Sequence, residues 1–344
     1  MTDDLPKHRR VYTALRHDIL LGKYDAAEKF PSEGMLMRRF GVSRITVRQA
    51  MTDLKNDGFL EARSGSGTYL SSLARHATGM IGLVIPDYAT SPFFRRLGDE
   101  LVRAGKAAGY TMLLGDLPGN TPAERAHEAI SLAKEYAARK VAGVIIEPVE
   151  LMPDSADLTR EIINAFDALK IPVLLVDRDI TPFERSRHDL VGIDNVSAGF
   201  TLGKLLIDAG ARRICFLMPP HSASTNLQRM LGVAGAVIHE GLSWSNKNIL
   251  CLDPNDKKAI RKALTGKTPP DAIVCHNDQT AEKLPRSVKV AGFDGLATGT
   301  RRAYPSMRQP FEQMSDTAIA TLLERIRNPH LPPRQILLRA EPVA

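Results

Sequence analysis

The stretch GVSRITVRQAM, from Gly41 to Met51, presents two different faces if it forms a helix. Val47, Ala50 and Met51 recur at the spacing of three or four residues that places side chains on one side of a helix. The opposite side carries polar and basic side chains, which are Arg44, Thr46, Arg48 and Gln49. Taken alone, this second face is as compatible with a solvated surface as with a binding surface, and the neighbouring sequence decides between them.

The segment before this helix predicts a second one close by. Residues 31–41, PSEGMLMRRFG, offer Ser32 as the N-cap and Gly41 as the terminating residue. The side chains expected in its core are Met35, Leu36 and Phe40. The helix that follows has Ser43 as its N-cap and should end near Asn56. Because so few residues separate the two helices, they must cross sharply, as in a helix-turn-helix.

A further helix and a hairpin complete the expected N-terminal domain. Residues 8–22, HRRVYTALRHDILLG, repeat apolar side chains at helical spacing, namely Val11, Leu15 and Ile19. Residues 58–70, GFLEARSGSGTYL, place two short strand-like runs around a glycine-rich tip, which is typical of a β-hairpin. Together these elements predict an α+β winged helix-turn-helix domain over residues 1–70. Residues 71–79 are small and polar, and we expect a linker there.

From Met80 onward, short apolar runs alternate with helix-length segments. The first set of runs is MIGLVIPD, TMLLGD, VAGVIIEP and IPVLLVDRD, and the second is DLVGID, RRICFLM, NILCLD, DAIVCHND and VKVAGFD. One intervening segment has Thr121 as an expected N-cap and Pro122 in the first helical turn. Continuous apolar strands that alternate with helices imply parallel sheets covered on both faces. Two sets of strands therefore predict a two-lobed α/β domain over residues 80–344.

Polar side chains follow most of these expected strands. They are Asp87, Glu147, Asp177, Asp253, Asn277, Asp278 and Asp294. Ligands of parallel α/β sheets bind at the carboxyl ends of the strands. We therefore expect a polar ring around a cleft.

Composition limits the classes of protein that fit. A chain of 344 residues suits two or three domains, and it has no apolar segment of membrane-spanning length and no apolar run near its start. We expect a cytoplasmic protein without membrane contact. Residues 1–75 contain 13 Lys and Arg against 9 Asp and Glu, a net charge of +4, whereas the remaining 33 against 30 give +3. This excess in the first fifth of the chain favours an anionic partner there.

The three cysteines, Cys215, Cys251 and Cys275, form no C-x-x-C pair and lie near no histidine cluster. We expect reduced core thiols, with no disulfide, no metal and no cofactor. The segment LTGKT ends like a phosphate-binding loop, but Arg261 occupies the position of its first glycine. No G-x-S-x-G or H-E-x-x-H motif occurs. An enzyme that acts on sugars is therefore the weaker alternative, and no catalytic residue is assigned.

The polar face of the helix after Ser43 has the chemistry of a DNA-reading surface. Arg44 and Arg48 lie one turn apart, and arginine can bind guanine O6 and N7 through two hydrogen bonds. Thr46 can bond a phosphate or a base, Ile45 can contact a thymine methyl group, and the free N–H groups at Ser43 can face a phosphate.

Residues 11–70 also resemble the winged helix of GntR-type regulators, in the strings FGVSRITVRQAMTDLKNDGFL and GSGTYL. The resemblance implies that Ser43, Arg44, Thr46 and Arg48 contact DNA and that Gly65 lets the wing approach the minor groove. The family usually has arginine after PSE, where this chain has Gly34, so Arg38 is a candidate substitute.

Residues 80–344 resemble the effector domain of LacI-type repressors, relatives of periplasmic sugar-binding proteins. The strings IGLVIPDYATSPFF, DLVGIDNVSAGFTLGKLLIDAGARRICFL, VKVAGFDG and PSMRQPFEQM carry the likeness. The resemblance implies that Arg229 forks onto two sugar hydroxyls opposite Asn277 and Asp294. Asp177 and Gln309 would close the ring near the hinge, and Phe93 or Phe94 would form an aromatic wall. Glu147, from the polar ring at the strand ends, is a further expected ligand-binding residue.

A GntR-type head on a LacI-type body is the plan of arabinose-repressor-like regulators. We therefore expect a homodimeric repressor that binds double-stranded operator DNA and responds to a small sugar, a pentose such as arabinose being the best candidate. A nucleobase or a phosphorylated sugar is the alternative, although the polar ring is more acidic than a phosphate site requires. Whether the ligand is an inducer or a corepressor stays open. The segment after Ala281 is shorter than in the family, and a rearranged dimer contact is one consequence that stays open.

Overall fold

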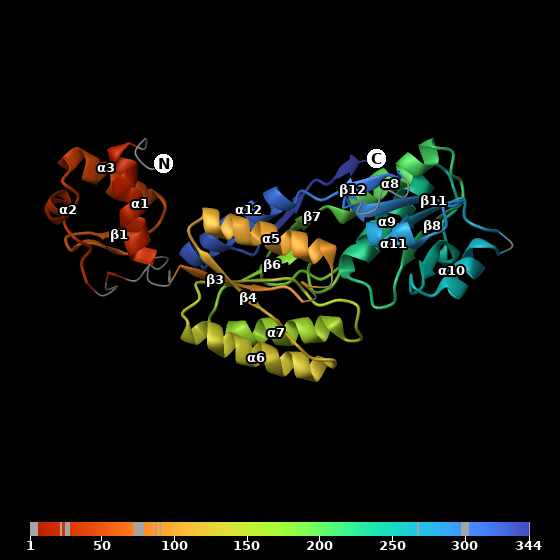
Figure 1. Cartoon of the computed structure of the whole chain (residues 1–344), viewed down its shortest axis with the longest axis horizontal. Helices are drawn as coiled ribbons and strands as arrows, with labels where there is room; N and C mark the ends of the chain where they lie inside the picture. Colours follow the sequence, from red (N-terminus) through yellow and green to blue (C-terminus); the bar gives the residue numbers. More distant parts are fainter. Residues whose placement is uncertain are drawn as a thin grey trace.

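A computed structural model describes residues 6–20, 23–24, 28–71, 79–86, 88–89, 91–266, 268–296 and 303–343. They form a small N-terminal domain and a larger body of two lobes, arranged along the long axis of the molecule (Figure 1). The expected linker, residues 71–79, and the expected polar side chain of Asp87 lie largely or wholly outside the described residues.

The N-terminal domain consists of three helices and a hairpin. These are α1 (Lys7–Leu20), α2 (Glu33–Phe40), α3 (Arg44–Asn56), β1 (Leu60–Arg63) and β2 (Gly67–Leu70), and the two strands pair antiparallel. The expected winged helix-turn-helix arrangement is present.

Local capping sets the sharp turn between α2 and α3. Gly41 ends α2 in the left-handed conformation, with φ of 61°, and its N–H bonds the carbonyl of Met37. Ser43 then caps α3 by accepting a hydrogen bond from the Thr46 N–H at 3.3 Å. Leu36 is buried as expected, but Met35 is 53% exposed, so the prediction that it lies in the core was wrong. In so short a helix only one narrow stripe can face the domain.

The first lobe contains a six-stranded, wholly parallel sheet of order β13-β7-β6-β5-β3-β4. Its strands are β3 (Met80–Val84), β4 (Thr111–Gly115), β5 (Val144–Ile146), β6 (Val173–Asp177), β7 (Asp189–Ile193) and β13 (Gln335–Leu338). Helices α5 (Pro92–Ala107) and α12 (Phe311–Arg327) cover one face, and α6 (Pro122–Ala138) and α7 (Ser155–Ala168) cover the other (Figure 1). The expected cap of α6 is present as a capping box between Thr121 and Glu124.

The second lobe contains a sheet of order β14-β12-β11-β10-β8-β9, parallel except for its last strand, β14. Its strands are β8 (Ile214–Met218), β9 (Ile249–Cys251), β10 (Ala272–Cys275), β11 (Lys289–Asp294), β12 (Ser306–Arg308) and β14 (Glu341–Val343). Helices α8 (Asn195–Asp208) and α9 (Ser224–His239) cover one face. The other is covered by α10 (Lys257–Leu264) and α11 (Asp278–Lys283), and a 3-10 turn, η1, spans Asn246–Asn248.

One strand belongs to a different lobe from the one expected. The order of runs along the chain places DLVGID in the second set, but β7 pairs with β6 and β13 in the first lobe, with Leu174 opposite Asp189. The chain crosses to the second lobe only after β7, at Asp194. It crosses back between β12 and α12, and once more between β13 and β14. Three connections between the lobes form the hinge.

Helices α8 and α9 touch backbone to backbone. A Cβ atom at Gly199 would lie 2.1 Å from the carbonyl oxygen of Arg229, and one at Gly232 would lie 2.0 Å from that of Val196. Neither contact leaves room for a methyl group, so glycine is required at both positions. The glycines therefore hold the helix that carries Arg229 in a fixed place against its neighbour.

Two of the three cysteines are buried thiols, as expected. Cys215 and Cys275 lie in the core of the second lobe, whereas Cys251 is exposed, so the core prediction was wrong for it. Cys251 lies on β9, at the edge of the sheet, where fewer neighbours cover a side chain. Among the residues that the structure describes, no helix is long and apolar enough to cross a bilayer.

Candidate functional site

The outward face of α3 presents the side chains expected to read DNA. Arg44 and Arg48 are exposed. Ile45 is 81% exposed, so its side chain does not belong to the core of the domain. Arg44 Nε lies 3.8 Å from a carboxylate oxygen of Glu33. The Thr46 hydroxyl is 2.9 Å from that of Ser43, so both side chains serve the helix start as well as facing outward.

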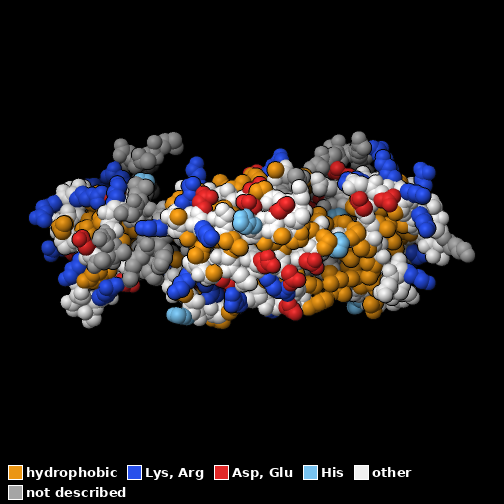
Figure 2. Space-filling view, turned by 90° about the horizontal axis from the view of Figure 1, so that it is seen from below, with side chains coloured by type: hydrophobic (Ala, Val, Ile, Leu, Met, Phe, Trp, Pro, Cys, Tyr) orange, Lys and Arg blue, Asp and Glu red, His pale blue; other side chains and the backbone are white. Residues whose placement is uncertain are grey.

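A groove of about 490 Å³ separates α3 from the wing. Arg48 lines it together with Lys29 and Lys55, two basic residues that the sequence reasoning did not single out. Gly65 at the wing tip has φ of 69° and open space around the position of a Cβ, and Arg38 is exposed on α2. Figure 2 shows Lys and Arg side chains gathered over this domain. The surface suits a polyanion.

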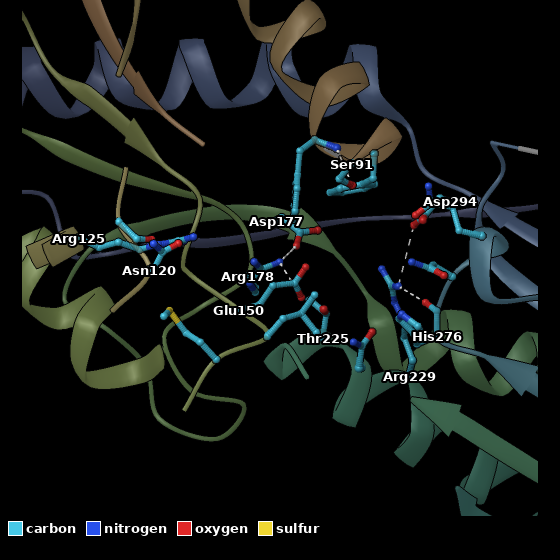
Figure 3. A pocket seen from close by; sticks show the side chains of 18 residues that line it. Ser91, Asn120, Arg125, Glu150, Asp177, Arg178, Thr225, Arg229, His276 and Asp294 are labelled. Carbon is cyan, nitrogen blue, oxygen red and sulfur yellow. Dashed lines mark hydrogen bonds and ion pairs between the residues drawn. The ribbon is translucent and has the colours of Figure 1, made fainter. Parts of the chain in front are cut away.

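The second site is a cavity of about 590 Å³ between the lobes (Figure 3). Six of the eight residues expected to bind a ligand line it, namely Phe93, Phe94, Asp177, Arg229, Asn277 and Asp294. Polar and charged side chains that the sequence reasoning missed also line it: Ser91, Asn120, Arg125, Glu150, Arg178, Thr225, Asn226, His276 and Gln279. Many of these lie in loops at the ends of strands and helices. Arg178 and His276, which adjoin the predicted Asp177 and Asn277, had a local signal.

Arg229 reaches the cavity from α9 and is held on three sides. Its Nε donates to Asn195 Oδ1 and its Nη1 donates to the carbonyl of His276, both at 2.8 Å. Its guanidinium carbon lies 4.4 Å from the centre of the Phe293 ring. Because these contacts fix the plane of the guanidinium, its fork can present two donors in a fixed direction.

Asp294 faces Arg229 from the end of β11, with 4.0 Å between Oδ1 and Nη1 (Figure 3). Burial raises the pKa of Asp294 to about 7, with Arg229 acting in the opposite direction. Gln309 was expected in the cavity lining, but it lies behind Asp294 and donates to its Oδ1 at 2.9 Å. It supports the carboxylate instead of lining the cleft.

Glu147 was also expected in the lining, but it is buried beneath it. Its carboxylate forms an ion pair with Arg178, whose Nη1 also donates to Asp177 Oδ2 at 2.8 Å. Burial acts to lower the pKa of Arg178, but the three carboxylates of Glu147, Glu150 and Asp177 together raise it and keep the guanidinium charged. The guanidinium of Arg178 compensates the charge of the buried Glu147 carboxylate, which explains why Glu147 does not line the cavity.

Two cleft carboxylates share an unusual backbone conformation. Asp177 has φ of 70° and Asp294 has φ of 100°, and each ends a parallel strand, one in each lobe. Positive φ is costly for a residue with a Cβ and tends to occur where side-chain placement matters for function. Oδ1 of Asp177 has no hydrogen-bond partner among the described residues, which leaves an acceptor at the cavity.

Asn277 and His276 lie together at the end of β10. Asn277 Oδ1 caps α11 by accepting the Thr280 N–H at 2.9 Å, so it has a structural role as well as a place in the lining. Burial lowers the pKa of His276 to about 3, and the nearby Arg229 acts in the same direction. The imidazole is therefore neutral at physiological pH.

The charges of the cavity are balanced and not acidic as expected from the strand ends. Three carboxylates, of Glu150, Asp177 and Asp294, are matched by three guanidinium groups, of Arg125, Arg178 and Arg229. Planar ionic groups of both signs beside Phe93 and Phe94 provide paired donors and acceptors next to an apolar wall. Such a lining suits a small, hydroxylated molecule.

Hydrogen bonds also cross between the lobes near the cavity. Ser224 Oγ donates to the Asp179 carbonyl at 3.1 Å, and Gln228 Nε2 donates to the Pro182 carbonyl at 3.3 Å. The Leu151 N–H donates to the carbonyl of His221 at 2.9 Å. The two lobes are thus in direct contact in this structure.

The raised pKa of Asp294 predicts a pH-dependent contribution to stability. The ordinary pKa is 3.8 and that of the folded protein is about 7, so folding binds a proton between these values. The stabilisation is fully present below pH 3.8 and is lost as the pH rises through 7, by at most ~4 kcal/mol. Urea unfolding at pH 5 and pH 8 should show that the wild type loses more stability than Asp294→Asn. Equal losses in the two proteins would contradict this assignment.

Two family profiles match the chain. Residues 7–70 match the gntR family of bacterial regulatory proteins, and residues 81–301 match the periplasmic binding protein domain. An arabinose metabolism transcriptional repressor from Geobacillus stearothermophilus is 25% identical over 348 residues, covering 94% of this chain and 92% of its own. The transcriptional repressor PurR from Photobacterium profundum is 25% identical over 273 residues, with 75% and 77% covered.

Solved structures show the same fold. A complex of the transcriptional regulator CelR with cellobiose has a TM-score of 0.65 at 18% identity, covering 92% of this chain and 99% of its own. A LacI-type regulator from Alkaliphilus metalliredigens complexed with D-xylulofuranose has a TM-score of 0.60 at 18% identity, with 77% and 97% covered. The chain therefore belongs to the periplasmic binding protein domain family and joins that domain to a gntR-family DNA-binding domain, which is the architecture of a ligand-responsive transcriptional regulator.

Proposed function

We propose that this protein is a cytoplasmic homodimeric repressor that leaves its operator when a small sugar binds in the cleft. The observation that carries the proposal is the fixed, forked guanidinium of Arg229 opposite Asp294, in a cavity between two lobes that also bears aromatic side chains. The exposed arginines of α3 supply the basic surface with which such a repressor would bind DNA. The contacts of Arg44, Arg48 and the wing with DNA are part of the proposal.

A neutral sugar, with a pentose such as arabinose as the best candidate, fits the lining. Adjacent sugar hydroxyls can accept from a guanidinium and donate to a carboxylate at the same time. Arg178 is already paired with Glu147 and Asp177, and Arg229 faces Asp294, so neither pair needs a charged ligand. The names of the relatives, an arabinose metabolism repressor among them, agree with a sugar.

The hinge suggests how a ligand in the cleft would act on the DNA-binding domain. Side chains from both lobes face the same cavity, so a bound sugar stabilises one relative position of the lobes. In a dimer, that change alters the distance between the two recognition helices, and operator affinity changes with it.

Two features of the second lobe are relevant to dimer formation. Val196 and Phe200 of α8 and Leu231 and Ile238 of α9 are exposed large apolar side chains, and Figure 2 shows an apolar area over this lobe. Contiguous apolar surface is typical of a protein interface. Helix α11 is only six residues long, so it offers little surface for the contact that the longer family helix makes.

A phosphorylated sugar is the second candidate, because one specific observation favours it. Arg125 and Asn120 line the cavity at the start of α6, away from the Arg229–Asp294 pair (Figure 3). A guanidinium there can bind a phosphate while the opposite end binds the sugar ring. Because the charge of the lining is balanced, an excess of carboxylates no longer opposes a phosphate.

A thermal-shift screen of the full-length protein tests the proposal. The panel contains L-arabinose, D-xylose, D-ribose, D-glucose, D-ribose 5-phosphate and hypoxanthine. We expect a neutral pentose to raise the Tm, since a ligand at 100 times its Kd stabilises by ~2.7 kcal/mol. Stabilisation by ribose 5-phosphate but not by ribose would favour the second candidate, and stabilisation by hypoxanthine alone would contradict the sugar proposal.

Operator binding measured with and without the hit then distinguishes the two modes of regulation. Loss of operator binding identifies an inducer and tighter binding a corepressor. Incubation of the same protein with glycosides of the hit tests the enzymatic alternative, because turnover would require an acid and base pair that the cavity does not single out.

A further inference from the structure

A second pocket, of about 700 Å³, lies at the hinge on the other side of Asp294. The ends of β11 and β12, the first turns of α12 and Arg96 of α5 line it. Asp294 lines both this hinge pocket and the effector cleft. One carboxylate therefore separates two cavities at a point where the chain passes between the lobes.

One side of the hinge pocket attracts anions. Arg308 is exposed and forms no ion pair among the residues that the structure describes, whereas Arg96 is bound to Glu100 at 2.9 Å. Helix α12 begins beside them with Pro310 as its N-cap and no side-chain cap hydrogen bond. The first N–H groups of this 17-residue helix carry its positive partial charge.

Gln309 provides a second and independent sign of a ligand. Only 2% of its surface is exposed, and it lines the hinge pocket but not the cleft. Its Nε2 donates to Asp294, while its Oε1 has no hydrogen-bond partner in the described part of the chain. A buried amide oxygen without a donor is unusual, and a hydroxyl group in the pocket would satisfy it.

The acidic side of the pocket restricts what can bind. Glu312 and Asp316 line it, and Asp316 is bound by Arg103 Nη2 at 3.0 Å. A molecule with anionic groups at both ends would be repelled there, whereas hydroxyl groups can donate to these carboxylates. The fitting ligand has one anionic group near Arg308 and hydroxyl groups elsewhere.

We propose that the hinge pocket binds a second regulatory ligand, a small hydroxylated molecule with a single anionic group, such as a sugar acid or a sugar phosphate. Its anionic group lies between Arg308, Arg96 and the start of α12, and its hydroxyls face Gln309 and Glu312. Because Gln309 holds Asp294, occupation of the hinge pocket changes the affinity of the cleft for its own effector, and the cleft changes that of the hinge pocket by the same factor.

Calorimetric titration of the full-length protein with D-gluconate, D-ribose 5-phosphate and inorganic phosphate tests the proposal. We expect one of the two hydroxylated anions to bind more tightly than inorganic phosphate. Arg308→Gln and Arg96→Gln, both exposed positions, should each weaken that binding at least tenfold. Arg125→Gln is the matched control, because it removes a guanidinium from the cleft instead, and binding to the hinge pocket should persist in it.

The outcomes separate the two sites. Loss of anion binding in Arg125→Gln with retention in Arg308→Gln would place the anion in the cleft and overturn the proposal. Binding of neither hydroxylated anion at millimolar concentration would also overturn it. The thermal shift produced by the neutral sugar is measured on Arg308→Gln as well, so a failure of the cleft proposal shows itself separately from a failure of this one.

Discussion

Replacing Arg229 by alanine should lower the affinity for the effector by 100-fold or more. The guanidinium is buried, and its Nη1 lies 4.0 Å from Oδ1 of Asp294. Among the described residues that line the cavity, Arg229 is the one arginine of the second lobe. Its removal deprives the ligand of two charge-assisted hydrogen bonds, a cost of ~3 kcal/mol or more. Calorimetric titration with the sugar found by the thermal-shift screen measures this effect.

Two comparisons make the Arg229 result specific. Arg229→Lys keeps the positive charge but has no fork, so it should recover only part of the affinity. Arg261→Ala on α10, outside the cleft lining, should bind the effector as the wild type does. Arg229→Ala should also stay on the operator at sugar concentrations that release the wild type. Unchanged affinity in Arg229→Ala would remove this residue from the site.

Replacing Arg48 by alanine should weaken binding to the operator by ~1–3 kcal/mol for each guanine that it reads. The side chain is exposed on α3 and lines the groove beside the wing, so the substitution leaves the core of the domain intact. Discrimination between operator and random DNA should fall, because alanine cannot hydrogen-bond a base edge. Fluorescence anisotropy on both DNAs at several salt concentrations measures this effect.

Lys55 offers the matched contrast, because it lines the same groove nearer the carboxyl end of α3. If it contacts a phosphate, Lys55→Ala should weaken binding to operator and random DNA alike and lower the salt dependence by about one ion. If the Arg48 and Lys55 variants both weaken binding to operator and random DNA by the same factor, neither residue reads a base.

Local sequence signals predicted most of the elements. The start of α3 at Arg44 and its end at Asn56 agree with expectation, because a serine N-cap and a terminating turn act within a few residues of the helix end. The capping box of α6 is equally local. The parallel strands were identifiable because burial on both faces requires continuous apolar runs.

Long-range packing explains what the sequence could not show. The apolar pattern of β7 is compatible with a strand of either sheet, and only its pairing with β6 assigns it to the first lobe. Glu147 and Gln309 follow strands as the lining residues do, yet Arg178 and Asp294 lie between them and the cavity. The loop residues Asn120 and Glu150 line the cleft because of how the elements of the first lobe pack together, so no local pattern marks them.

The glycine contact between α8 and α9 has a consequence for engineering this protein as a sensor. Arg229 and its supporting Asn195 lie on two helices that cannot slide past each other without a backbone clash. This half of the cleft therefore has a fixed shape, and any new ligand must be complementary to it. Altered specificity should come from the first-lobe loops that carry Asn120 and Glu150, because substitutions there leave α8 and α9 unchanged. Libraries limited to those loops should retain folded, DNA-binding protein far more often than libraries that include α8 and α9.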